Sequence, residues 1–233
     1  MSGKVKKMIV IVLFGASGSG KTTIAQQICD EYDGTVVLNL DIFYKDIPKD
    51  RTLRLATVGL GAWGGYATRE EYINHYNFDA PDSLNWGLAR SVIARLRAGE
   101  TVSLKKYSFT EHCHTDEDLE IVPGPILLVE GIHAYKARDL ADLVVYVDTS
   151  LDFCLMRRLQ RDMSPENGRG RTFAQATDQW VRTVRPAFKK YIEPQKDNVH
   201  LVIQNDGERA DIDTSVLLSQ IAGLHKKSVK KIY

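Results

Sequence analysis

The stretch Gly15-Ala16-Ser17-Gly18-Ser19-Gly20-Lys21-Thr22 follows directly on the apolar run 8–14 and leads into a segment with helical spacing, 22–30. It matches G-x-x-x-x-G-K-[ST], the pattern of a phosphate-binding loop. Glycines let the backbone approach an oligophosphate with its N–H groups turned inward, while Lys21 supplies positive charge. The phosphates would lie at a helix N-terminus, and the Thr22 hydroxyl is a suitable ligand for Mg²⁺. A strand before the motif and a helix after it favour a nucleotide-binding loop over a chance match in Gly/Ser-rich sequence.

The composition fits one intracellular domain. The chain has 233 residues, enough for a single α/β domain over 1–233 and too few for two of ordinary size. Its 31 Lys and Arg against 30 Asp and Glu give a net charge of +1, so no global field recruits nucleic acid or a membrane. Three widely spaced cysteines fit a reducing compartment, and no stretch reaches membrane-spanning length. We therefore expect a cytoplasmic protein.

Strand-like and helix-like segments alternate along the chain. Continuous apolar runs, typical of strands buried on both faces, occur at 8–14, 36–40, 126–129, 143–147 and 200–203. Helical spacing occurs at 83–98, 151–163, 173–191 and 211–224. This pattern predicts an α/β fold with a mainly parallel sheet and helices on both faces. We expect a long surface excursion at 49–77, a Gly-interrupted lid region at 157–171 and a solvated basic tail at 226–233.

Two carboxylates end predicted strands, where open α/β sheets bind ligands. Asp41 would orient an acceptor hydroxyl, accept its proton and hold water of a magnesium shell, although an ordinary turn aspartate remains the alternative. Glu130 ends a buried run, in the place where a Walker-B type acid approaches the metal. The four apolar residues before it disfavour the alternative, a glutamate that faces solvent.

Five arginines surround the Gly-interrupted break. Three of them, Arg157, Arg158 and Arg161, share one predicted helix, and Arg169 and Arg171 follow it. Together they suit a lid that closes on a transferring phosphate, excludes water and neutralises developing charge. The alternative is a solvated basic helix whose charges pair with Asp162, Glu166 and Asp178.

Six blocks in one order resemble the uridine kinase family, also called the uridine-cytidine kinases, over nearly the whole chain. They are 15–22, Asp41-Ile42-Phe43-Tyr44-Lys45, Asn77-Phe78-Asp79-Ala80-Pro81-Asp82, Tyr107-Ser108-Phe109-Thr110-Glu111-His112, Glu130-Gly131-Ile132, and the arginine run 157–171; Arg185-Pro186-Ala187-Phe188 resembles a later helix of the family. The resemblance implies a P-loop kinase fold, Mg²⁺, and transfer of the γ-phosphate of ATP to the 5′-hydroxyl of a pyrimidine ribonucleoside. It also implies a homotetramer.

The resemblance assigns roles to individual residues. Asp41 resembles the catalytic aspartate, with Lys21, Arg161 and Arg169 at the transferring phosphate, and Thr22, Glu130 and Asp41 resemble the metal side. The nucleoside would contact Asp41, Tyr44, Phe78, Asp79, Tyr107, His112, Arg158, Arg171 and Gln179, and ATP would contact Gly15, Ala16, Ser17, Gly18, Ser19, Gly20, Lys21, Thr22 and Thr23.

The chemistry of two side chains agrees with these roles. The Asp79 carboxylate can accept from two vicinal hydroxyls, so it would reject a 2′-deoxy substrate. Neutral His112 can donate to uracil in one tautomer and accept from the cytosine amine in the other.

The chain departs from the family at three places: 49–77 is longer than usual, Ile42 stands where serine is common, and the lid carries extra residues at 165–167. These departures concern the acceptor, so kinases of the same fold that act on nicotinamide riboside, pantothenate or phosphoribulose remain alternatives. A regulatory nucleotide-binding protein is the alternative from another class, although the chain has no Asn-Lys-x-Asp element for reading guanine.

Overall fold

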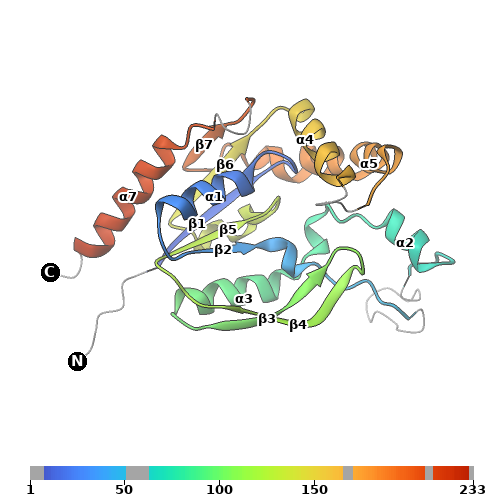
Figure 1. The fold of residues 1–233 in the computed structure, drawn as a ribbon, viewed down its shortest axis with the longest axis horizontal. Coiled ribbons are helices and arrows are strands. Elements are labelled where there is room, and N and C mark those ends of the chain that lie inside the picture. Colours follow the sequence, from blue (N-terminus) through green and yellow to red (C-terminus); the bar gives the residue numbers. More distant parts are fainter. Residues whose placement is uncertain (1–7, 51–62, 165–169, 208–211, 231–233) are drawn as a thin grey trace.

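The computed structural model describes residues 8–50, 63–164, 170–207 and 212–230 and is built on one parallel sheet (Figure 1). The sheet has the order β2-β5-β1-β6-β7. Its strands are β1 (Ile9–Gly15), β2 (Thr35–Asn39), β5 (Ile126–Glu130), β6 (Leu143–Asp148) and β7 (Leu201–Gln204). All five predicted strands and their parallel pairing are confirmed.

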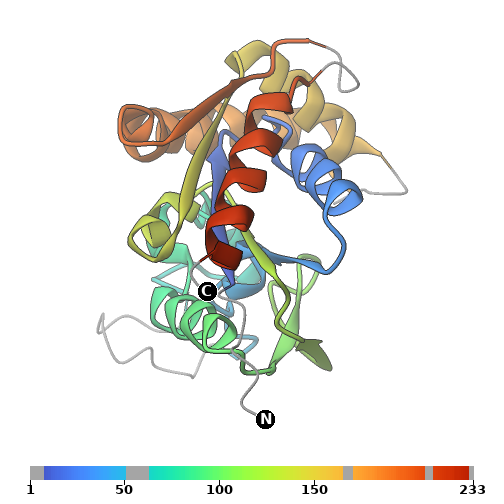
Figure 2. The same ribbon diagram turned by 90° about the vertical axis from the view of Figure 1, so that its left-hand side faces the viewer.

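Helices cover both faces of the sheet, which explains why its strands read as unbroken apolar runs. Alternate residues of β1 serve two cores: Ile11 packs with α1 (Lys21–Glu31) and α7 (Ser215–Lys230), and Val12 packs with α3 (Trp86–Arg97). Figure 2 shows α7 lying across the strands with α1 beside it. Helix α4 (Leu151–Met163) has the bounds that the sequence predicts. The described part of the expected solvated basic tail, 226–230, continues α7, and Lys226 is exposed.

The predicted helix 173–191 is helical but not uniformly α-helical. It runs through α5 (Phe173–Gln179), a π turn η4 (Trp180–Val184), α6 (Arg185–Ala187), a second π turn η5 (Phe188–Ile192) and η6 (Glu193–Gln195). Pro186 has no N–H and its ring would meet the carbonyl four residues back in an α-helix, so a wider turn before it relieves the clash.

Two elements are absent from the sequence prediction. An antiparallel hairpin of β3 (Val102–Ser108) and β4 (Cys113–Ile121) lies apart from the main sheet, and α2 (Arg69–His75) lies within the expected excursion. Much of the hairpin is exposed and charged, and no residue of α2 is buried. Helix α2 has no apolar stripe, and the apolar alternation of the hairpin is limited to Val102, Leu104, Leu119 and Ile121, which is too short for a clear periodic signal.

Short 3₁₀ turns complete the fold: η1 (Leu40–Phe43), η2 (Pro81–Ser83) and η3 (Ala134–Leu140). The first follows β2 directly, so Asp41 lies at the same edge of the sheet as Glu130 and Gly15. In the described part of the chain, no helix is long and apolar enough to cross a membrane.

Candidate active site

The phosphate loop is held in a conformation that only glycine adopts easily. Gly18 has a φ of 89° and Gly20 a φ of 93°. A Cβ on Gly18 would lie 2.5 Å from the carbonyl oxygen of Cys154, and one on Gly20 would lie 2.3 Å from Nδ2 of Asn205. The loop therefore packs closely against α4 and the chain after β7, and α1 begins directly behind it at Lys21.

Two residues that the sequence did not indicate, Thr149 and Asn205, hold the backbone of the phosphate loop. The carbonyl of Ser19 accepts hydrogen bonds from Thr149 Oγ1 at 3.1 Å and from Asn205 Nδ2 at 2.6 Å. Lys21 Nζ donates to the carbonyl of Ala16 at 2.8 Å. Burial lowers the pKa of Lys21, and the nearby charge of Glu130 opposes that shift.

Glu130 lies at the centre of the residues that the resemblance assigns to the metal side. The residue is only 3% exposed, and its carboxylate accepts from Thr22 Oγ1 at 3.3 Å and from Asn39 Nδ2 at 3.0 Å. Burial raises the pKa of Glu130, and the charge of Lys21 works against that rise. The structure therefore brings Thr22, Glu130 and Lys21 together as the sequence predicts.

Asn39 is a further residue that the sequence did not indicate. Its Oδ1 accepts from the backbone N–H of Asp41 at 2.8 Å, while its Nδ2 contacts Glu130. It thereby links the two carboxylate-bearing segments. Knowledge of the register between β2 and β5 could have indicated Asn39, because Asn39 stands directly opposite Glu130 in that strand pair.

Aromatic side chains gather beside the hairpin. Phe78 stacks on His112 with ring centroids 4.9 Å apart, and Tyr44 lies 5.6 Å from Tyr107 and 5.9 Å from Phe78. The turn between β3 and β4 carries His112, whose φ of 51° is in the left-handed region. Burial raises the pKa of Tyr107, with the charge of Asp46 as a second cause. The missed hairpin thus supplies two of the predicted nucleoside-binding residues.

Asp79 is buried, with 6% of its surface exposed, and is held through several atoms. Its Oδ2 accepts from Thr183 Oγ1 at 2.8 Å, and its carbonyl accepts from His133 Nε2 at 2.8 Å. Burial lowers the pKa of His133 to about 4, so this ring is neutral at pH 7 and donates through Nε2–H.

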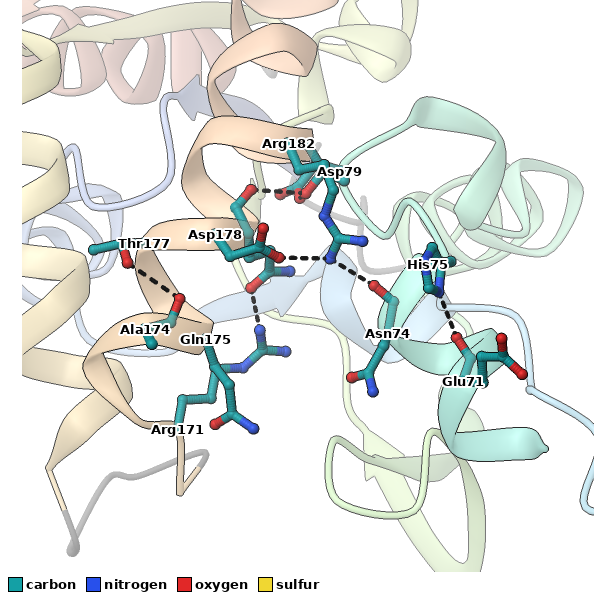
Figure 3. A network of polar contacts seen from close by, with 12 residues as sticks. Glu71, Asn74, His75, Asp79, Arg171, Ala174, Gln175, Thr177, Asp178 and Arg182 are labelled. Atoms are coloured by element: carbon teal, nitrogen blue, oxygen red, sulfur yellow. Dashed lines mark hydrogen bonds and ion pairs between the residues drawn. The ribbon is translucent and has the colours of Figure 1, made fainter. Parts of the chain in front are cut away.

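Arg158 and Arg171 meet at Gln179. Arg158 is 3% exposed and donates to Ser17 Oγ at 2.8 Å and to Gln179 Oε1 at 2.9 Å, while its Nε lies 3.3 Å from Asp162 Oδ2. Arg171 donates to the same Gln179 oxygen, and Figure 3 shows Arg171 in this network. Through Gln179 on α5, the side chains of Arg158 on α4 and Arg171 are joined.

The remaining arginines divide. Arg161 pairs with Asp162 at 2.8 Å, whereas Arg157 donates to the carbonyls of Asn205 and Gly207. Arg157 thereby joins α4 to the chain after β7, and it also lines the cavity described below. Arg169 lies outside the described residues.

The alternative that α4 is a solvated basic helix does not fit the structure, because Arg157, Arg158 and Asp162 on it are buried. Asp162 pairs with Arg158 and Arg161 as that alternative expects, but Asp162 is fully buried. Asp178 pairs with Arg182 instead (Figure 3).

These groups line a cavity of about 1150 Å³. It brings together phosphate-loop residues, both carboxylates and the aromatic group; the predicted site residues that line it are Ser17, Gly18, Gly20, Lys21, Thr22, Thr23, Asp41, Tyr44, Phe78, Asp79, Tyr107, His112, Glu130, Arg158, Arg161, Arg171 and Gln179.

A phosphate loop at the carboxyl edge of a parallel sheet, with acidic residues and arginines around one cavity, defines a P-loop kinase. The chain belongs to the phosphoribulokinase/uridine kinase family, whose model matches residues 10–212. This family membership makes it an ATP-dependent phosphotransferase.

Individual relatives agree with this placement. A uridine kinase of Borrelia duttonii (strain Ly) is 34% identical over 95% of this chain and 98% of its own length. A uridine kinase of Shewanella frigidimarina (strain NCIMB 400) is 33% identical over 95% and 99%. Among solved structures, phosphoribulokinase from Rhodobacter spheroides shares the fold, with a TM-score of 0.56 and 18% identity over 85% of this chain and 70% of that one.

Proposed function

We propose that this kinase transfers the γ-phosphate of ATP to the 5′-hydroxyl of uridine and cytidine, giving UMP and CMP for pyrimidine salvage. One observation carries the proposal: the cavity that holds the phosphate loop is also lined by Phe78, His112 and Asp79. A nucleoside has a flat base and a vicinal diol, which suit an aromatic stack and a carboxylate. The curated relatives named uridine kinase support the same acceptor.

The residues present fit ATP and Mg²⁺. The loop from Gly15 to Thr23 offers backbone N–H groups at the start of α1, and a Cβ on Gly18 or Gly20 would fill its cradle. Thr22, Glu130 and Asp41 offer the oxygen donors that Mg²⁺ prefers. Bound ATP supplies the phosphoryl group, and Mg²⁺ neutralises charge on its phosphates.

Side chains of the protein position the acceptor and counter the negative charge of the transferring phosphate. Asp41 orients the 5′-hydroxyl and accepts its proton as the bond to phosphorus forms. Lys21 and Arg161 face the same cavity and counter the charge of the transferring group, as Arg169 would from the lid.

The acceptor is held along its length. Asp79 and Arg158 bind the ribose hydroxyls, and the rings of Tyr44, Phe78 and Tyr107 contact the base beside His112. Arg171 also lines this part of the cavity. Because Gln179 Oε1 already accepts from both Arg158 and Arg171, Gln179 would contact the acceptor through its amide N–H₂.

The test is release of ADP from ATP and Mg²⁺ with a panel of acceptors: uridine, cytidine, 2′-deoxyuridine, nicotinamide riboside, pantothenate and ribulose 5-phosphate. We expect the highest kcat/KM on uridine and cytidine, and a higher value on another acceptor would overturn the proposal. ADP release that does not depend on any acceptor would favour a regulatory nucleotide-binding protein.

Asp41→Asn tests the mechanism. The variant should retain ATP binding and lose about 10² to 10⁴-fold in kcat, because a general base contributes that range. Asp33→Asn is the matched control, since Asp33 is exposed and does not line the cavity. A kcat near that of the wild type would remove Asp41 from this role.

A further inference from the structure

We propose that Thr183 is a positioning residue, which orients the Asp79 carboxylate toward the ribose hydroxyls of the acceptor. The inference rests on the proposed function, because it concerns the group that would hold the ribose. None of the blocks that carry the family resemblance includes Thr183. Its role emerges only from the fold, since Thr183 and Asp79 are 104 residues apart in the chain.

The contact leaves one carboxylate oxygen available. Thr183 Oγ1 donates to Asp79 Oδ2 at 2.8 Å, and no hydrogen bond from the described residues reaches Oδ1. Rotation of an aspartate carboxylate about χ2 is broad, so a single fixed donor on Oδ2 decides where Oδ1 points. Asp79 lines the cavity, so Oδ1 remains for a ligand hydroxyl.

The Thr183 hydroxyl has one proton to donate and two acceptors within hydrogen-bond distance. Oγ1 also lies 3.1 Å from the carbonyl oxygen of Gln179, one turn earlier. The contact with Asp79 is shorter, and a hydrogen bond to a charged acceptor is stronger than one to a neutral carbonyl. The proton therefore goes to Asp79.

The π turn presents Thr183 to Asp79. In η4 the N–H of Arg185 donates to the carbonyl of Trp180, five residues back, instead of four. Such a turn holds one residue more than an α-helical turn, and one residue corresponds to a rotation of about 100°. The side chains from Thr183 onward consequently face a different direction from that of an uninterrupted helix.

The same π turn is fastened to the chain that leads into Asp79. Arg182 Nη2 donates to the carbonyl of Asn74 at 2.7 Å and pairs with Asp178 at 2.9 Å (Figure 3). Asn74 lies on α2, five residues before Asp79. The π turn η4 and the segment that leads into Asp79 are thus held together by a contact that does not involve Thr183.

The backbone of Asp79 is also held independently. Its N–H donates to Asn77 Oδ1 at 3.1 Å, and its carbonyl accepts from His133. Removal of the Thr183 hydroxyl should therefore free the carboxylate without moving the loop.

The experiment compares three variants with the wild type for uridine and 2′-deoxyuridine. Thr183→Val removes the hydroxyl and retains the shape, Thr183→Ser retains the hydroxyl, and Thr177→Val is the matched control. Among the described residues, Thr177 donates to the carbonyls of Phe173 and Ala174 in its own helix, and Figure 3 shows the contact with Ala174. Kinetic constants for both nucleosides and for ATP are measured, with melting midpoints.

For Thr183→Val we expect kcat/KM for uridine to fall about tenfold, mainly through KM, because a buried hydrogen bond to a charged group is lost. The preference for uridine over 2′-deoxyuridine should fall by a similar factor, while KM for ATP is unchanged. Thr183→Ser should restore both values, and Thr177→Val should match the wild type.

An unchanged preference in Thr183→Val, or a loss that Thr183→Ser does not restore, would overturn this inference while uridine kinase activity stands. A wild type that phosphorylates neither uridine nor cytidine would overturn the proposed function and this inference with it. If Thr183→Val does not fold, the pair Thr183→Ala and Thr183→Ser gives the same comparison, because both lack the methyl group and only serine has the hydroxyl.

Discussion

Gly18 illustrates how a single residue position limits the phosphate loop. Its φ of 89° is strained for any residue with a Cβ, and its backbone passes the carbonyl of Cys154 on α4. Two separate costs therefore oppose a side chain here: left-handed strain and a collision with backbone. Gly99, after α3, has a similar φ of 86°, but a Cβ there would have no neighbouring atom within 4 Å among the described residues.

We expect Gly18→Ala to lower the free energy of unfolding by more than Gly99→Ala does. The left-handed backbone alone costs roughly 1 to 2 kcal/mol, and the 2.5 Å approach to the carbonyl oxygen of Cys154 adds to it at Gly18. Urea unfolding of both variants measures the difference, and ATP binding should weaken only in Gly18→Ala. Equal losses in the two variants would show that the packing of the loop against α4 is unimportant.

The positions of several candidate site residues were predictable because their motifs are local. Lys21, Thr22, Asp41 and Glu130 each stand in, or shortly after, a strand whose apolar run identifies it. Asn39 was not predictable, because its importance depends on which strand lies beside β2.

At the scale of elements, α2 is held to the fold at its start by Arg69 and near its end by Arg182, which donates to the carbonyl of Asn74. Arg69 donates to the carbonyls of Ile47 at 3.2 Å, Pro48 at 3.3 Å and Glu111. The indole of Trp63 donates to Pro48 as well. Since no residue of α2 is buried, apolar packing contributes little to its position.

We expect Arg69→Met to loosen α2 and leave the rest of the fold intact. Amide exchange at Tyr72 and Tyr76, whose N–H groups close this helix, should accelerate at least about tenfold. Arg95→Met is the control, because Arg95 forms an exposed ion pair with Glu100, just after α3. Exchange in α2 that is equally slow in both variants would contradict this account.

The two missed elements have a common physical cause. Both gain stability from contacts with distant segments, such as the Ile47 N–H to the carbonyl of His112 and Arg69 to the chain at 47–48. No residue of α2 is buried, and the core-facing apolar residues of the hairpin are confined to Val102, Leu104, Leu119 and Ile121 at one end of it. Periodicity reports burial of a face over a whole segment, so it does not detect these elements.

At the scale of the whole molecule, buried titratable groups determine how stability varies with pH. His133 is 1% exposed and its pKa is lowered to about 4, whereas its unfolded value is about 6.5. Between these values the unfolded chain binds more protons, so stability falls as pH decreases from 6.5 toward 4.

We expect His133 to account for roughly 3 kcal/mol of that loss, from the difference between the two pKa values. His133→Gln retains an amide donor for the carbonyl of Asp79 and does not titrate. Burial raises the pKa of Glu130, which acts in the opposite direction, but this contribution is present in both proteins and cancels. The unfolding free energies of the two proteins should therefore converge or cross as pH falls, and a constant difference would refute the assignment.

The sequence by itself determined the phosphate loop, the five parallel strands and the end positions of Asp41 and Glu130. These features are local: a strand covered on both faces must be continuously apolar, and a phosphate cradle must be rich in glycine. Only the tertiary structure decided that Asn39 contacts Glu130, that Thr183 donates to Asp79 and that Arg157 donates to the carbonyl of Gly207. Those contacts join residues that are far apart in the chain, up to 104 positions for Thr183 and Asp79, so they depend on strand register and helix rotation, which no short pattern in the chain encodes.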